Sequence, residues 1–151
     1  MHICLIGYGL TNLILAKQLL KKKIKVDLYY KKKPYFNKSV RTISISSDNI
    51  DYLKSTKLPI FEKGWPVNHI KIFNENNKEK EIFNFDGTQS IKFFVFKNDL
   101  VFKQIDKSLS RSKNLKKIQI KSESTYDKII RNKNYNLIIN SEPNNKIIKF
   151  L

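Results

Sequence analysis

A chain of 151 residues can bury one ordinary hydrophobic core. Its formal net charge of +17 comes almost entirely from lysine, because Arg41, Arg111 and Arg131 are the three arginines among 30 basic residues. Sites specific for nucleic acids favour arginine, so we expect a solvated lysine surface and no specific nucleic-acid partner. No apolar run approaches the ~20 residues of a membrane span, and the single cysteine, Cys4, fits a reduced cytoplasmic setting.

The first residues have the pattern of a strand, a tight turn and a helix. The apolar run from His2 to Ile6 leads into Gly7 and Gly9, and an apolar-periodic segment covers 10–23. This order is typical of the first βαβ unit of a dinucleotide-binding fold. In that interpretation Gly7 permits the turn and Gly9 lets the backbone approach a pyrophosphate. The backbone N–H groups at the start of the helix, at Leu10 and Thr11, would hold the pyrophosphate. The alternative is a glycine turn that binds nothing.

Two departures make the match to this motif partial. Asn12 occupies the third glycine position, where helix and strand normally pack without a side chain. The acid that holds a ribose hydroxyl normally ends the second strand, predicted here over 24–30, and that place is taken by Tyr30. Asp27 lies three residues earlier, inside the strand. We therefore expect the ribose clamp to be absent or replaced.

The rest of the chain alternates between helical and strand periodicity without internal repeats. The segments predicted as strands are 41–46, 67–74, 80–85, 90–97, 115–121 and 136–140. Helices are predicted over 47–54 and 98–110, a loop with short helical turns over 58–66, and either a strand or a short helix over 126–131. The three strands of the middle region are expected to form an antiparallel meander, with a hairpin turn at Asp86 and Gly87.

These elements predict an α/β fold in which a Rossmann-like parallel sheet carries an inserted antiparallel meander. The predicted nucleotide-binding domain comprises 1–66 and 98–151, and the inserted sheet comprises 67–97. We find no Ser/His/Asp arrangement, no metal-ligand cluster and no P-loop, so no catalytic or metal-binding residue is proposed from the sequence.

Several ordered motifs resemble the N-terminal part of the flavin-dependent aromatic hydroxylases of ubiquinone biosynthesis, the 2-octaprenyl-6-methoxyphenol hydroxylase group. Gly7-Tyr-Gly occupies the FAD pyrophosphate turn, and Arg41-Thr-Ile-Ser-Ile-Ser resembles the family's Arg-Thr-x-Ala-Leu-Ser segment. Trp65-Pro-Val-Asn-His-Ile-Lys-Ile resembles its Pro-Ile-x-x-Ile-x-Val strand. Phe93-Phe-Val-Phe-Lys-Asn resembles the strand before its Val-x-Glu-Asn helix start.

The resemblance implies an FAD-dependent monooxygenase that uses NAD(P)H as reductant and transfers oxygen to an electron-rich ring. It also implies that Arg41 and Asn98 lie near the FAD. Glu142-Pro143 stands where the family has Asp-Gly, and Leu151 comes before its second FAD-binding segment. We therefore expect an incomplete N-terminal portion, inactive alone, to which a second chain could supply the missing half. The alternative is a truncated or degenerate dinucleotide-binding module without catalysis.

Overall fold

The computed structural model describes residues 1–33, 41–55, 64–75, 80–86 and 93–143. The chain divides into two compact units, which are considered separately: unit 1 comprises Met1–Asn37 and Ile105–Leu151, and unit 2 comprises Lys38–Gln104. Among the described residues, no helix has the length and apolar character needed to cross a membrane.

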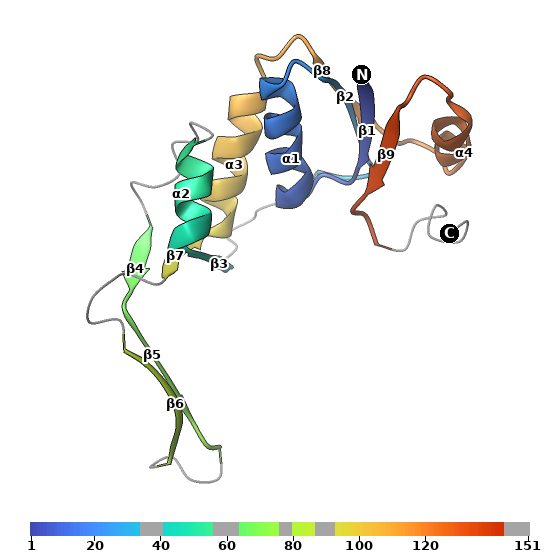
Figure 1. Ribbon diagram of the computed structural model, residues 1–151. Helices are drawn as coiled ribbons and strands as arrows, with labels where there is room; N and C mark the ends of the chain where they lie inside the picture. The colour runs from blue at the N-terminus through green and yellow to red at the C-terminus, as the bar shows by residue number, and fades with distance from the viewer. Residues whose placement is uncertain (34–40, 56–63, 76–79, 87–92, 144–151) are drawn as a thin grey trace. The chain divides into compact units, whose positions relative to one another are not determined.

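Unit 1 is built on a four-stranded parallel sheet in the order β8-β2-β1-β9 (Figure 1). The strands are β1 (His2–Ile6), β2 (Lys25–Tyr30), β8 (Leu115–Gln119) and β9 (Leu137–Asn140). In the parallel register, Cys4 lies beside Asp27 of β2 and Ile138 of β9. With β1 as the first strand, this is the 3-2-1-4 order of a dinucleotide-binding sheet.

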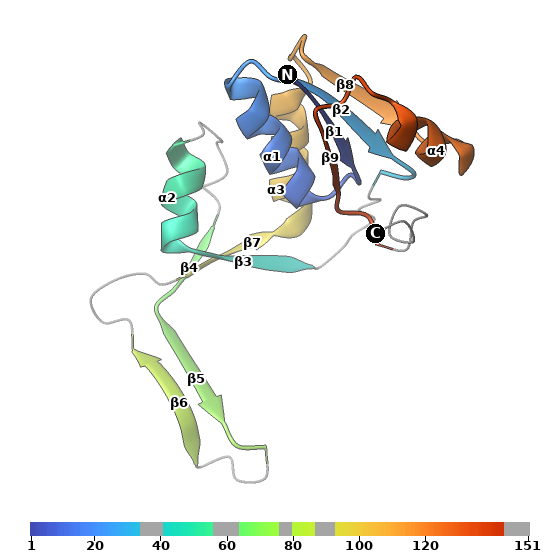
Figure 2. The same cartoon turned by 45° about the vertical axis from the view of Figure 1, so that its right-hand side comes forward.

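Helices lie on both faces of this sheet, as a buried parallel sheet requires (Figures 1 and 2). Helix α1 (Leu10–Lys21) is on one face, and α4 (Ser124–Arg131) is on the other, where Tyr126 and Ile129 pack against Cys4 and Ile6. The segment 126–131, which the sequence left open, is therefore helical. Burial and the charge of Asp27 raise the pKa of Cys4 to about 12, so this thiol is an inert core side chain.

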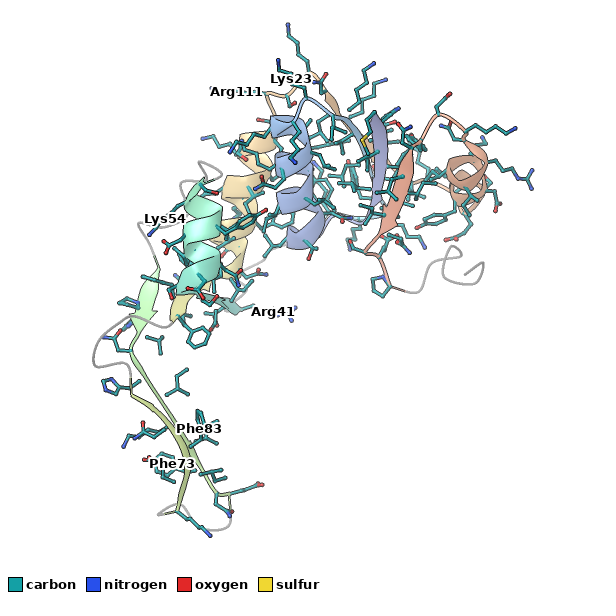
Figure 3. The ribbon with its side chains drawn as sticks, viewed as in Figure 1. Lys23, Arg41, Lys54, Phe73, Phe83 and Arg111 are labelled. Carbon is teal, nitrogen blue, oxygen red and sulfur yellow. The ribbon has the colours of Figure 1, made fainter. Side chains whose placement is uncertain are left out.

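Helix α1 ends two residues before the predicted residue 23. The chain leaves the helix at Lys22, and Lys23 adopts a φ of 60°, the left-handed conformation common after helix ends (Figure 3). Lysines suit the C-terminal end of a helix, but three in a row do not indicate at which of them the helix ends, and the usual asparagine or glycine is absent.

Unit 2 contains two separate antiparallel sheets. The first has the order β3-β7-β4, and the second pairs β5 with β6. The strands are β3 (Thr42–Ser46), β4 (Trp65–Val67), β5 (His69–Phe73), β6 (Glu81–Asp86) and β7 (Phe93–Lys97). Helix α2 (Ser47–Ser55) follows β3 directly, and α3 (Asn98–Leu109) follows β7 and continues into unit 1.

The predicted fold class is confirmed, and the pairing of the middle strands is corrected in one respect. All are antiparallel, but β7 pairs with β3 and β4 instead of with β6, so the three predicted strands do not form one continuous meander. Periodicity identifies a strand but not its neighbours, and here β7 bonds to a strand about 50 residues earlier in sequence. Trp65 and Pro66, predicted as loop, form β4 together with Val67, the first residue of the predicted strand 67–74. Residues 56–63 and Gly87 lie outside the described residues. The domain boundaries at 66/67 and 97/98 stay a prediction.

The β5–β6 hairpin exposes large apolar side chains (Figure 3). Ile72 and Phe83 lie opposite each other in the register and are 50% and 44% exposed, and the neighbouring Phe73 is 47% exposed. A two-stranded sheet is at best marginally stable in water without a covered face. Ile72, Phe73 and Phe83 thus give this hairpin an exposed apolar surface.

The parallel sheet supplies a direct test of the assigned core. Leu5 of β1 is 0% exposed, whereas Leu137 of the neighbouring β9 is 47% exposed. We predict that Leu5→Ala lowers the free energy of unfolding by about 2–5 kcal/mol, because it leaves a cavity. The matched change Leu137→Ala should cost less than about 1 kcal/mol. Urea-induced unfolding measures both, and equal losses would contradict the placement of β1 inside the sheet.

Candidate functional site

The candidate site lies at the carboxyl ends of β1 and β9, where the order of the parallel sheet reverses. From β1 the chain passes through α1 to β2 on one side, while β9 lies on the other side of β1. Open α/β sheets bind ligands in the crevice at this switch point. The residues that follow the two strands are Gly7 to Gly9 after β1, and Ser141 and Glu142 after β9.

The turn after β1 requires glycine at Gly7 for two independent reasons. Its φ is +107°, a conformation that other residues rarely adopt. A Cβ at this position would also lie 2.8 Å from Ser141 Oγ and 3.3 Å from the backbone nitrogen of Glu142. The Gly7 N–H donates to the carbonyl of Tyr29 over 2.8 Å, which ties the turn to the end of β2.

Gly9, in contrast, faces open space at the start of α1. It is exposed, its backbone is extended, and a Cβ there would meet no atom within 4 Å. No side chain caps the helix, and its first turn contains no acidic residue. Helix α1 begins at Leu10 and Thr11. A ligand can therefore approach the free backbone N–H groups and the partial positive charge of this helix start. This geometry suits an anion such as a pyrophosphate.

Asn12 stabilises the turn instead of disturbing it. The side chain is 1% exposed, and its Nδ2 donates to the carbonyl oxygens of Ile6 over 2.8 Å and of Gly7 over 2.9 Å. The sequence showed only that a glycine was missing here. In place of the close helix–strand contact that a glycine would allow, the Asn12 side chain links the helix to the turn through two hydrogen bonds.

At the carboxyl end of β2, Tyr30 takes the place of the ribose acid and packs on Tyr8, with ring centroids 4.7 Å apart. Asp27 cannot replace that acid, because it is 8% exposed and held elsewhere. Its Oδ2 accepts a hydrogen bond from Tyr135 over 2.7 Å and lies 3.2 Å from His2 Nε2. In this structure Asp27 therefore belongs to a network inside the sheet.

One carboxylate, Asp106, lies beneath the turn. Tyr8 donates its phenol proton to Asp106 Oδ1 over 2.6 Å, and Lys117 Nζ donates to the same oxygen. Desolvation by burial raises the pKa of Asp106, but the hydrogen bonds from Lys117 and Tyr8 outweigh it and hold the pKa below its usual range. Burial, followed by the bond to Asp106, raises the pKa of Tyr8. At neutral pH the pair is therefore a carboxylate and a neutral phenol.

Glu142 approaches the glycine turn from β9. Its Oε2 accepts a hydrogen bond from Tyr126 of α4 over 2.7 Å, and its own N–H donates to Asn140 Oδ1 over 3.1 Å. Burial and then this carboxylate raise the pKa of Tyr126. The resemblance placed Glu142-Pro143 at the family's Asp-Gly motif, and the structure shows that Glu142, which follows the last parallel strand, lies at the same edge of the sheet as Gly7.

The remaining two predicted site residues belong to unit 2. The N–H of Asn98, the first residue of α3, donates to the carbonyl of Arg41 over 3.0 Å. Arg41 is exposed and Asn98 is half-buried. The structure thus brings Arg41 and Asn98 together in one unit, and Gly7, Gly9, Leu10 and Thr11 together in the other. A common ligand for the two groups stays a prediction.

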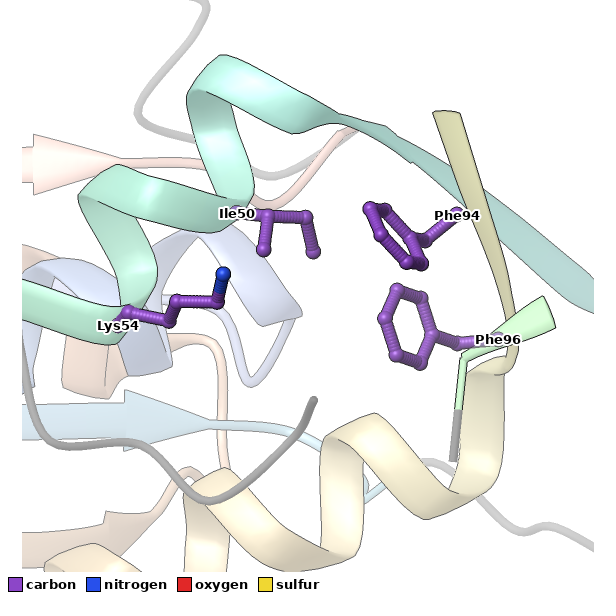
Figure 4. Close-up of a pocket in the computed structure, with 4 residues that line it drawn as sticks. All are labelled: Ile50, Lys54, Phe94 and Phe96. Atoms are coloured by element: carbon purple, nitrogen blue, oxygen red, sulfur yellow. The ribbon is translucent and has the colours of Figure 1, made fainter. Parts of the chain in front are cut away.

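Unit 2 also contains a small pocket between α2 and β7 (Figure 4). Ile50 and Lys54, one helical turn apart, line it with Phe94 and Phe96, whose ring centroids are 6.4 Å apart. Its volume is about 110 Å³. Phe96 is 3% exposed, and Lys54 Nζ forms an ion pair with Asp51 over 3.1 Å, so the pocket is an apolar recess with a partly neutralised cation at its edge.

Known structures share this fold, although no family model and no curated protein sequence matches the chain. The p-nitrophenol 4-monooxygenase PnpA from Pseudomonas putida DLL-E4 is similar over 78% of this chain and 31% of its own, with TM-score 0.62 and 16% identity. PqsL from Pseudomonas aeruginosa, described as a probable FAD-dependent monooxygenase, is similar over 79% of this chain and 33% of its own length, with TM-score 0.62 and 10% identity. The 2,6-dihydroxypyridine-3-hydroxylase from Arthrobacter nicotinovorans is similar over 77% of this chain and 28% of its own length, with TM-score 0.54 and 11% identity.

At these identities the similarity establishes the fold. The mixed α/β architecture is that of the N-terminal, FAD-binding part of flavin monooxygenases, and the chain spans about a third of the length of these structures.

The two glycines give a matched pair of substitutions. We predict that Gly7→Ala destabilises the protein by about 1–3 kcal/mol, because alanine must adopt a positive φ against β9. Gly9→Ala should change the free energy of unfolding by less than about 0.5 kcal/mol, because its backbone is extended and the space is open. Urea-induced unfolding of both variants distinguishes them, and a fully stable Gly7→Ala variant would contradict the geometry of the turn.

Proposed function

We propose that this chain is the dinucleotide-binding part of an FAD-dependent aromatic-ring monooxygenase of the ubiquinone-biosynthesis type, with NAD(P)H as reductant. One observation carries the proposal: Gly9 leaves open space at the uncapped start of α1, at the switch point of a parallel sheet. The FAD pyrophosphate would accept hydrogen bonds from the N–H groups of the first helical turn, at Leu10 and Thr11. The fold shared with flavin monooxygenases supports FAD among the possible dinucleotides.

The residues present fit the pyrophosphate of FAD better than its adenosine ribose. The pyrophosphate has a suitable cradle, but the adenosine ribose lacks its usual acid, because Tyr30 stands in that place and Asp27 is bound to Tyr135 and His2. Bound flavin would supply the oxygen chemistry, and the protein would supply position and electrostatics. In unit 2, we propose that Arg41 and Asn98 contact the cofactor from the start of α3.

We further propose that the complete catalytic unit needs polypeptide beyond these two units, supplied by a second chain or by the same one. The similar structures are about three times as long. The exposed Ile72, Phe73 and Phe83 of the β5–β6 hairpin supply an apolar surface that such polypeptide would cover. A cytoplasmic location remains a proposal from the single reduced cysteine.

From this arrangement we predict that the 151-residue chain binds FAD weakly, with a dissociation constant above roughly 10 μM, or about −7 kcal/mol. The reason is that phosphate contacts at a helix start contribute only about 1 kcal/mol each without a ribose clamp. Calorimetric titration measures the affinity, and Gly9→Ala should weaken it at least about fivefold, because its methyl group occupies the space that the pyrophosphate approaches.

Two controls accompany this titration. Thermal unfolding should show that Gly9→Ala is folded, and no NAD(P)H-dependent oxygen consumption should occur. Submicromolar binding with turnover would contradict the incomplete-site account. Unchanged affinity of the Gly9→Ala variant would contradict the assignment of the pyrophosphate to this turn.

A further inference from the structure

We propose that Asp106 and Lys117 are positioning residues for the phosphate site. Asp106 anchors the Tyr8 hydroxyl and so fixes the glycine turn, while Lys117 neutralises Asp106 so that this anchor does not repel a bound phosphate. The inference rests on the proposed dinucleotide site at Gly9. It adds to that site two residues that lie outside the turn and come from α3 and β8.

The glycine turn needs such an anchor because its two glycines are held unequally. Gly7 is fixed by contacts of its own backbone, but Gly9 has open space around it, and a glycine in open space can adopt many conformations. Tyr8, between them, is held through its side chain: it is 4% exposed, and its hydroxyl donates to Asp106 Oδ1 over 2.6 Å. This bond therefore restricts the part of the turn that leads to Gly9 and the free N–H groups of α1.

Asp106 is itself fixed, because it lies on a part of α3 that is packed into unit 1. Its neighbour Ile105 is 0% exposed, and Leu109 is 1% exposed. Lys17 Nζ of α1 donates to the carbonyl of Ser108 over 3.4 Å, so the end of α3 is also tied to the helix that follows the turn. A hydrogen bond from a phenol to a carboxylate is shorter and stronger than one to a neutral acceptor. Asp106 thus supplies a rigid, charge-assisted anchor.

A carboxylate beneath an anion site is unfavourable by itself, because it repels the phosphate that would bind there. Lys117 removes this repulsion: its Nζ donates to the Asp106 oxygen that Tyr8 also bonds, and it lies 5.6 Å from the centre of the Tyr8 ring. The side chains of Lys117 and Asp106 are 21% and 27% exposed, so salt screens this pair less than a pair at the surface. Lys33 also acts on Asp106 through space, whereas Lys117 is hydrogen-bonded to it. The bonded pair of Asp106 and Lys117 therefore carries no net charge.

Removal of the anchor should lower the affinity for a nucleotide as well as the stability of the protein. ADP carries the pyrophosphate, and its dissociation constant is measured from the backbone amide NMR signals of Gly9 and Leu10 in the ¹⁵N-labelled 151-residue chain. Tyr8→Phe removes the hydroxyl and keeps the ring, and we expect it to weaken ADP binding at least about fivefold, because the turn must then be ordered on binding. The matched control is Tyr135→Phe, which removes an equivalent bond to Asp27, 2.7 Å long and inside the sheet, and should leave the affinity unchanged.

Removal of the neutralising charge should weaken binding for a different reason. We expect Lys117→Gln to weaken ADP binding at least about threefold, and more at low salt, because Asp106 is then an unpaired carboxylate near the phosphates. Lys116→Gln removes an equal charge from the exposed neighbouring residue of β8 and should leave the affinity nearly unchanged. The double variant Lys117→Gln/Asp106→Asn should recover the affinity of the unmodified chain, because asparagine still accepts the Tyr8 hydroxyl but carries no charge. A purely structural role predicts no such recovery.

Thermal unfolding shows whether each variant is folded. Tyr8→Phe and Lys117→Gln act on different residues, so a folding failure in one leaves the other as the test. Equal losses of affinity in Tyr8→Phe and Tyr135→Phe, or no recovery in the double variant, would overturn this inference and leave the proposed nucleotide site intact. Failure of the unmodified chain to bind ADP would overturn the proposed function with it.

Discussion

The turn after β1 is the constraint on which the site depends. Gly7 is held from three directions: its N–H bonds to the end of β2, its carbonyl accepts the Asn12 amide, and its Cα faces Ser141 and Glu142 at the end of β9. The positive φ that results sets the direction in which the chain enters α1. Gly9 then leaves the helix start open. A backbone fixed in this way would offer its N–H groups to an anion without reorganisation on binding, and we propose this as the source of affinity for a phosphate group.

Around this fixed turn, paired tyrosines and carboxylates determine what else the site can hold. Tyr8 donates a short hydrogen bond to Asp106, and Tyr126 donates one to Glu142. Burial and these carboxylates raise the pKa of both phenols, which therefore stay neutral at neutral pH. Two lysines beside Asp106 then make the β2 side of the turn cationic, whereas Glu142 makes the β9 side acidic. The high overall charge of the protein adds a non-specific attraction for anions.

Local patterns in the sequence were sufficient for most of the elements and for the glycine turn. The apolar run before Gly7, the helical period after Gly9 and the missing acid at Tyr30 were all readable, because each depends on neighbouring residues. Pairing over long distances was not readable: nothing in the sequence of β7 indicates that β3 and β4 are its partners. The role of Asn12 was also missed, because it acts through hydrogen bonds to the backbone of the turn. The domain boundaries and the roles of Arg41 and Asn98 stay predictions.

The central claim is that a nucleotide binds at the turn between β1 and α1, at the edge of the sheet shared with β9. The most direct measurement is the change in backbone amide NMR signals of the ¹⁵N-labelled chain on titration with ADP, which carries the pyrophosphate without a flavin or nicotinamide ring. The account predicts that the largest shifts occur at Gly9, Leu10, Thr11 and Glu142, with small shifts at Ile50 and Phe94 of the unit 2 pocket. Shifts concentrated in unit 2, or spread evenly over the exposed lysines, would contradict it.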